Sequence, residues 1–98
     1  MNQKPMIDPA NDDFGTVLNC AVRYALGRQT YMPSLVMDFI RPLIPHLSDK
    51  TLWCFDKDIE EAEREDRLGD PNIDAPEWRT FHIAVRAERI KRTTKENR

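Results

Sequence analysis

Apolar side chains recur every three or four residues in four stretches of the sequence, which is the spacing of one face of an α-helix. The first stretch predicts a helix over 13–26, which Asp12 or Asp13 caps and Gly27 ends. Its expected buried face consists of Phe14, Val17, Leu18, Ala21, Val22, Ala25 and Leu26.

A second helix is predicted to begin at Pro33, because proline is tolerated in a first turn. Pro42 removes one backbone hydrogen bond and clashes with the carbonyl of Asp38, so we expect a bend there and a stop before Pro45. The expected buried residues are Leu35, Val36, Phe39, Ile40, Leu43 and Leu47.

Two further helices have clear start signals. Ser48 is a capping residue for the third, which is expected to end at Gly69 and Pro71. The fourth opens on a capping box of Asp74 and Glu77, with Ile73 and Trp78 as a hydrophobic staple. Their expected buried residues are Leu52, Phe55, Ile59 and Ala62 in the third helix, and Trp78, Phe81, Val85 and Ile90 in the fourth.

These elements predict an all-α fold, a compact bundle of about four helices with short connections, in which the second helix is kinked at proline. The chain has 98 residues, enough for one core. We expect a mobile N-terminal arm over 1–12, a single helical domain over 13–92 and a frayed C-terminal tail over 93–98. Trp53 lies off the main stripe of its helix, so burial and a homodimer contact both stay open for it.

Composition and residue patterns disfavour membrane insertion and catalysis. Charged residues make up 33% of the chain, and no apolar run approaches the roughly 20 residues that span a bilayer, so a cytoplasmic protein is expected. Cys20 and Cys54 lie in helical patterns and are expected to be buried free thiols. His46 and His82 are expected at the surface or its boundary, and none of these residues has the spacing of a zinc site. The sequence predicts no enzyme, no cofactor and no metal.

Charge is distributed unevenly along the chain. Residues 48–77 hold four basic and eleven acidic side chains, a net −7, whereas residues 78–98 hold seven basic and two acidic, a net +5. We expect the two runs not to neutralise each other, because they lie toward opposite ends of a helical hairpin. The acidic run can be a solvated face relieved by Arg64 and Arg67, or a partner-binding surface that attracts a basic protein or imitates nucleic-acid phosphates. Its members are Asp56, Asp58, Glu60, Glu61, Glu63, Glu65 and Asp66.

The basic run supports a different hypothesis, a nucleic-acid interface. Its residues are Arg86, Arg89, Lys91, Arg92, Lys95 and Arg98. The overall net charge of −2 weakens this hypothesis. The first two helices resemble a helix-turn-helix only loosely, because Arg41 is the only strong cation on the second.

The segment YALGRQTYMP, residues 24–33, joins the first two helices. Gly27 ends one helix and Pro33 starts the next, while Tyr24 is expected to pack beneath the corner. The turn itself needs none of Arg28, Gln29 and Tyr31. Tyrosine and arginine concentrate binding energy in interfaces, so these three residues are candidates for contacting a protein partner.

Three stretches, NCAVRYALGRQTYMPSLVMDFI, LSDKTLWCFDKDIEEAE and LGDPNIDAPEWRTFHIAVRAE, resemble small phage and prophage proteins of Gram-positive bacteria. The resemblance spans about Phe14 to Arg92 and implies no catalytic residue or cofactor. It implies an accessory protein in a bacterial host cell that binds a host or phage macromolecule; inhibitors of bacterial defence, such as anti-CRISPR proteins, belong to that class. The expected function is non-enzymatic protein binding, with nucleic-acid binding by the basic helix as the alternative.

Overall fold

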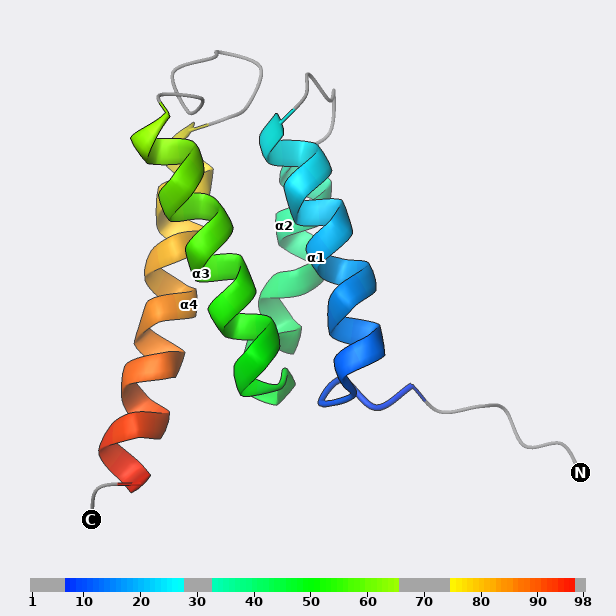
Figure 1. The fold of residues 1–98 in the computed structure, drawn as a ribbon, viewed down its shortest axis with the longest axis vertical. Coiled ribbons are helices and arrows are strands. Elements are labelled where there is room, and N and C mark those ends of the chain that lie inside the picture. The colour runs from blue at the N-terminus through cyan, green and yellow to red at the C-terminus, as the bar shows by residue number, and fades with distance from the viewer. Residues whose placement is uncertain (1–6, 28–32, 66–74, 97–98) are drawn as a thin grey trace, which may run out of the picture.

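The computed structural model describes residues 7–27, 33–65 and 75–96, and at a few helix ends it describes the backbone alone. Within these ranges the chain forms α1 (Asp12–Gly27), α2 (Pro33–Ile40), a 3-10 helix η1 (Arg41–His46), α3 (Asp49–Arg64) and α4 (Ala75–Glu96), and no strand. Successive α-helices run in opposite directions (Figure 1). The predicted all-α bundle is therefore confirmed.

The helices pack around α3. It lies between α1 and α4 and contacts both, while α2 and η1 lie behind them and also reach α4 (Figure 1). The core that these contacts enclose consists of Leu18, Val22, Ala25, Leu26, Met37, Ile40, Ile44, Leu47, Leu52, Phe55, Ile59, Ala62, Trp78, Phe81 and Val85. Every buried residue predicted for the third helix, and three of the four predicted for the fourth, belong to it.

Three aromatic side chains join α3 to α4 at the centre of the core. The Trp78 and Phe81 rings meet edge to face with centroids 5.6 Å apart, and Phe55 lies 6.1 Å from Phe81. Each of the three is fully buried. Edge-to-face packing adds to the free energy gained by burying the rings, so this cluster fixes the α3–α4 pairing on which the polar contacts described below depend.

Several predicted core residues instead point outward. Val17, Leu35, Phe39 and Ile90 are 56–67% exposed. On α2 the inward face consists of Met37 and Ile40, and the same side of the chain continues through η1 to Ile44 and Leu47. Leu35 and Phe39 lie on the opposite side of that helix, so the prediction that they are buried is wrong. Short helices with apolar residues on two sides leave the choice of face to their neighbours.

The prolines after α2 change the helix type. Helix α2 ends at Ile40, and the chain continues in 3-10 conformation from Arg41 to His46 with Pro45 inside it. Pro42 therefore interrupts the α-helix as predicted, but the helical turns do not stop before Pro45. Pro42 stands in the first turn of this 3-10 helix, where no intrahelical partner exists for the N–H that proline lacks.

Side-chain caps fix the starts of α1 and α3. Asn11 Oδ1 accepts hydrogen bonds from the backbone N–H groups of Asp13 and Phe14, at 2.8 and 3.1 Å. The cap of α1 is therefore Asn11, and the prediction of an aspartate cap is wrong. Ser48 Oγ accepts from the Thr51 N–H at 3.1 Å, which confirms the predicted cap of α3.

Helices α1 and α3 touch where Gly15 faces Thr51. Both residues are buried, and a Cβ added at Gly15 would overlap the Thr51 hydroxyl and lie 2.9 Å from the Thr51 Cβ. The absence of a side chain at position 15 therefore permits this close approach. It sets how near α1 lies to the helix that carries the acidic run.

Candidate binding surfaces

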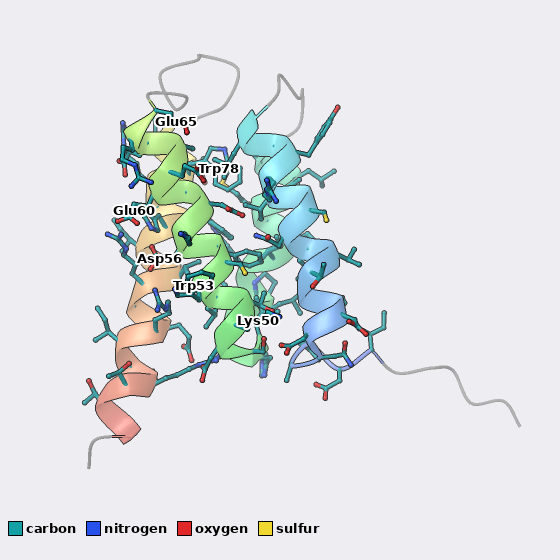
Figure 2. All side chains as sticks on the ribbon, in the orientation of Figure 1. Lys50, Trp53, Asp56, Glu60, Glu65 and Trp78 are labelled. Carbon is teal, nitrogen blue, oxygen red and sulfur yellow. The ribbon has the colours of Figure 1, made fainter. Side chains whose placement is uncertain are left out.

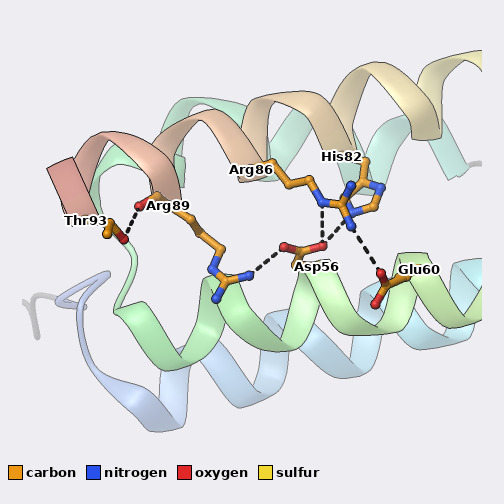
Figure 3. A network of polar contacts seen from close by, with 6 residues as sticks. All are labelled: Asp56, Glu60, His82, Arg86, Arg89 and Thr93. Atoms are coloured by element: carbon orange, nitrogen blue, oxygen red, sulfur yellow. Dashed lines mark hydrogen bonds and ion pairs between the residues drawn. The ribbon is translucent and has the colours of Figure 1, made fainter.

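A buried carboxylate on α3 holds the basic face of α4. Asp56 is only 7% exposed, and three side chains of α4 converge on it (Figure 3). His82 Nε2 and Arg86 Nε lie 2.6 and 3.0 Å from its Oδ1, and Arg89 Nη1 lies 2.6 Å from its Oδ2. The three donors are spaced along α4 at i, i+4 and i+7, on one face of that helix.

The charge on Asp56 follows from these contacts. Burial acts to raise the pKa of its carboxyl group, but the hydrogen bonds from His82, Arg89 and Arg86 outweigh burial and lower the pKa below its ordinary value. An ionised carboxylate only accepts hydrogen bonds, so His82 donates to it from Nε2. His82 is itself 7% exposed, which corrects the prediction of a surface or boundary histidine.

Further carboxylates also pair with the arginines of α4. Arg86 reaches Glu60 at 3.4 Å, and Arg92 lies 2.8 Å from both Asp49 and Glu88. Burial alone would lower the Arg92 pKa, but the two carboxylates raise it above its ordinary value. The acidic and basic runs therefore neutralise each other in part, contrary to expectation, because Arg86, Arg89 and Arg92 lie directly beside the N-terminal half of α3 and its flank.

Lys91 is the exception among those predicted nucleic-acid-binding residues whose side chains the structure describes. It is exposed, and none of the ion pairs found in the described part of the chain involves it. Lys95 belongs to α4, but its side chain lies outside the described residues, as does all of Arg98. Among the side chains that the structure describes, the candidate nucleic-acid interface thus consists of three paired arginines and one exposed lysine.

The predicted acidic surface is divided among different environments (Figure 2). Asp56 is buried, and Asp58 is half-buried and accepts a hydrogen bond from Asn19 Nδ2 at 2.8 Å. Glu60 pairs with Arg86, and Glu63 lies 3.7 Å from Arg79. Glu61 and Glu65 are exposed near the end of α3, and Asp66 lies outside the described residues. The set predicted as one surface therefore contains both structural and solvent-facing carboxylates.

The corner between α1 and α2 is only partly described. Arg28, Gln29 and Tyr31 lie outside the described residues, so their role stays a prediction. Tyr24 belongs to the last turns of α1 and is 61% exposed, so the expectation that it packs beneath the corner is wrong. The last turns of α1 therefore present an aromatic ring to solvent.

Other candidate residues take varied positions. Cys20 and Cys54 are free thiols, but Cys20 is exposed and Cys54 only partly buried, so the prediction of burial is wrong. Trp53 is 48% exposed, with Lys57 Nζ 5.3 Å from its ring centroid. Among the described residues there is no group of three potential metal ligands, and no helix there is long and apolar enough to cross a membrane.

A shallow cavity of about 360 Å³ opens beside the Asp56 network. Its lining residues are Asp56, Arg86, Arg89, Ile90, Thr93 and Thr94. Thr93 donates its hydroxyl proton to the Arg89 carbonyl, and the two arginines share the charge of Asp56. A small anion would have to compete with that carboxylate, whereas Ile90 extends the cavity onto an apolar surface.

That apolar surface is the outward face of α4, which was not predicted from the sequence. Its exposed residues are Thr80, Ile83, Ala87, Ile90 and Thr94. They follow one another at steps of three, four, three and four, so they form one stripe opposite the buried Trp78, Phe81 and Val85. The alternating steps of three and four are visible in the sequence. The core residues of α4 show the same steps, so the spacing alone does not tell the outward stripe from the buried one.

A second outward stripe lies on α1. Val17 and Tyr24 are 67% and 61% exposed, and the exposed Cys20 lies between them on the same side of the helix. No protein-family model, curated protein or solved structure matches this chain. The function of this chain is therefore inferred from the geometry of these surfaces.

Proposed function

We propose that this chain is a non-enzymatic, phage-type accessory protein that acts by binding another protein. Inhibition of a bacterial defence system, such as an anti-CRISPR activity, is the specific form that we propose for it. The observation that carries the protein-binding proposal is the uncharged outward face of α4, from Thr80 to Thr94.

This face is unusual for its setting. One residue in three of the chain is charged, yet five successive outward positions of α4 carry no charge. Ile83 and Ile90 are 69% and 65% exposed at its centre. Alternating steps of three and four are the pattern by which one helix packs against another, and the stripe is about 21 Å long at 1.5 Å per residue. An amphipathic helix of a partner protein fits such a surface.

The flanks of the stripe indicate the charge of that partner. Arg79, Arg86 and Lys91 lie beside it. Glu63 and Glu60 compensate the two arginines in part, at 3.7 and 3.4 Å, whereas Lys91 has no ion pair in the described part of the chain. A partner helix with acidic residues beside its apolar stripe complements this arrangement.

Nucleic-acid binding is less well supported by the same contacts. Phosphate binding depends on cations that are free to neutralise phosphates, which releases the counterions condensed on the nucleic acid. Arg86, Arg89 and Arg92 are each held by at least one carboxylate of the protein itself. Binding a phosphate chain would have to displace Asp56 or Asp49 from these arginines, and this displacement lowers the net free energy gained on binding.

The test is capture of partners by the tagged full-length chain from a bacterial lysate, with and without nuclease. We expect the wild type to retain a stoichiometric protein after nuclease treatment and an Ile83→Ser/Ile90→Ser variant to lose it. A Leu35→Ser/Phe39→Ser variant is the matched control, because those side chains are similarly exposed on α2. Recovery that disappears with nuclease, or that is equal in both variants, contradicts the proposal.

A further inference from the structure

The outward stripe of α1 differs in character from that of α4. Its line of exposed residues is Asp13, Val17, Cys20 and Tyr24, at steps of four, three and four. The buried Leu18, Val22 and Ala25 lie on the opposite side of the helix. None of the hydrogen bonds or ion pairs found within the described residues ties Val17, Cys20 or Tyr24 to another element. The stripe is therefore an unpartnered helix face.

Charge along α1 is arranged so that the helix complements itself. Asp12 and Asp13 stand in its first turn, and Arg23 stands exposed near its other end. Arg23 lies ten residues after Asp13, so the opposite charges are about 15 Å apart along the helix axis. Both are equally distant along the helix axis from the level of Leu18, close to the midpoint of the line of exposed residues from Asp13 to Tyr24.

We propose that α1 is a self-association surface, on which a second copy of this chain docks by pairing its own α1 in the antiparallel direction. A two-fold axis at the level of residues 18–19 places Val17 opposite Cys20 of the second copy. The same axis brings Asp12 and Asp13 beside Arg23 and Tyr24 of the second copy. Symmetry repeats each of these contacts, so one interface gains two sets of opposite charges.

The antiparallel direction follows from the charges and the backbone. A parallel pair would place the acidic first turns of the two chains together, and Arg23 beside Arg23 of the second copy. Like charges in contact oppose binding. Antiparallel helices also bring each positive N-terminal end of the helix dipole beside a negative C-terminal end. On α4, by contrast, Arg79 and Arg86 flank the stripe, so two copies joined there would bring arginines together.

The first test is sedimentation of the full chain over about a hundredfold range of concentration. We expect the mean mass to rise toward that of a dimer, and Val17→Glu to weaken association by at least about tenfold, because it puts an unpaired charge into the contact. Val17 is two-thirds exposed, so the variant should keep the helical circular dichroism of the wild type. Ile83→Glu is the control on α4, and it should associate like the wild type.

A charge exchange tests the direction of pairing. Arg23→Glu alone and Asp12→Lys/Asp13→Lys alone should each weaken the dimer roughly tenfold, since each turns attractive contacts into repulsive ones. Combining all three changes restores opposite charges across an antiparallel pair and should recover most of the affinity. In a parallel pair the combined variant would gain nothing.

Cys20 supplies a direct probe of the contact. In a Cys54→Ala background, a short bis-maleimide should link two chains through Cys20, and Val17→Glu should abolish the link. A chain that stays monomeric at all concentrations, or whose dimer is insensitive to Val17→Glu, overturns the inference. Because Val17→Glu leaves α4 unchanged, that outcome is independent of the partner-capture experiment.

Discussion

Replacing Asp56 by asparagine should destabilise the fold strongly, although the two side chains have nearly the same shape. The carboxylate is 7% exposed and receives hydrogen bonds from His82, Arg86 and Arg89. The amide keeps one acceptor oxygen, loses the charge, and turns an N–H₂ group toward donors that it cannot accept from. The network that fastens α4 to α3 therefore loses its centre.

The size of this destabilisation follows from how exposed each hydrogen-bond partner of Asp56 is. The side chains of Arg86 and Arg89 are 48% and 40% exposed, so water can replace much of the interaction that they lose with position 56. Their contribution to the change in unfolding free energy is therefore small. The side chain of His82 is only 9% exposed, so its N–H depends on position 56. Weakening the bond to the histidine and burying a mismatched amide together should lower the free energy of unfolding by about 2–3 kcal/mol. For a domain of this size that corresponds to a drop in melting temperature of about 10–20 °C.

Urea denaturation at neutral pH, followed by helical circular dichroism, measures this difference. Glu61→Gln is the matched control, because Glu61 belongs to the same helix but is exposed and has no ion pair within the described residues. We expect the control to change the free energy of unfolding by less than about 0.5 kcal/mol. If Asp56→Asn proved as stable as Glu61→Gln, the carboxylate network would not hold the helices together.

The pH dependence supplies a second criterion. The pKa of Asp56 is lower in the folded protein than its ordinary value of 3.8, so the stability that this group contributes is complete above that value. It is lost as the pH falls through the folded pKa. The difference in unfolding free energy between wild type and Asp56→Asn should therefore shrink as the pH falls through the folded pKa of Asp56. A difference that persisted unchanged into strong acid would refute the assigned charge.

Two further predictions concern the packing and capping of α3. Gly15→Ala should lower the free energy of unfolding by about 1–2 kcal/mol, because the strain of overlap with Thr51 exceeds the roughly 1 kcal/mol that alanine contributes to a helix. Urea denaturation checks this, and adding Thr51→Ala should cost less than the sum of the two single changes if the contact is real. Ser48→Ala should cost about 1 kcal/mol by removing the acceptor for the Thr51 N–H, whereas Ser48→Asp should retain most of the stability. Equal melting temperatures for these two variants would contradict the cap.

The positions of the helices could be predicted from the sequence because the signals for them act over one or two turns. Ser48 caps α3 within three residues, and the spacing of Leu52, Phe55 and Ile59 identifies its buried face without reference to any other helix. Apart from Trp53, α3 has one apolar stripe and a largely charged remainder, so only one orientation buries that stripe. On α4 the predicted core residues Trp78, Phe81 and Val85 are buried as expected, although that helix also has apolar residues on its other side.

The candidate surfaces depended on the tertiary structure instead. On α1, α2 and α4, apolar residues stand on two sides, and Val17, Phe39 and Ile90 have the spacing of core residues although they face solvent. The neighbouring helices decide which side is enclosed. Long-range ion pairs were likewise unpredictable, since Asp56 and Arg89 are separated by 33 positions and meet only because α4 returns antiparallel to α3.

The sequence by itself thus determined the helical class, the helix starts at Pro33 and Ser48, and the core of the α3–α4 pair, because those features follow from local spacing and local hydrogen bonds. Only the tertiary structure decided which charges are paired inside the protein and which apolar stripes remain outside it. Burial and long-range pairing are properties of what packs against a helix, and no single stretch of sequence contains both partners.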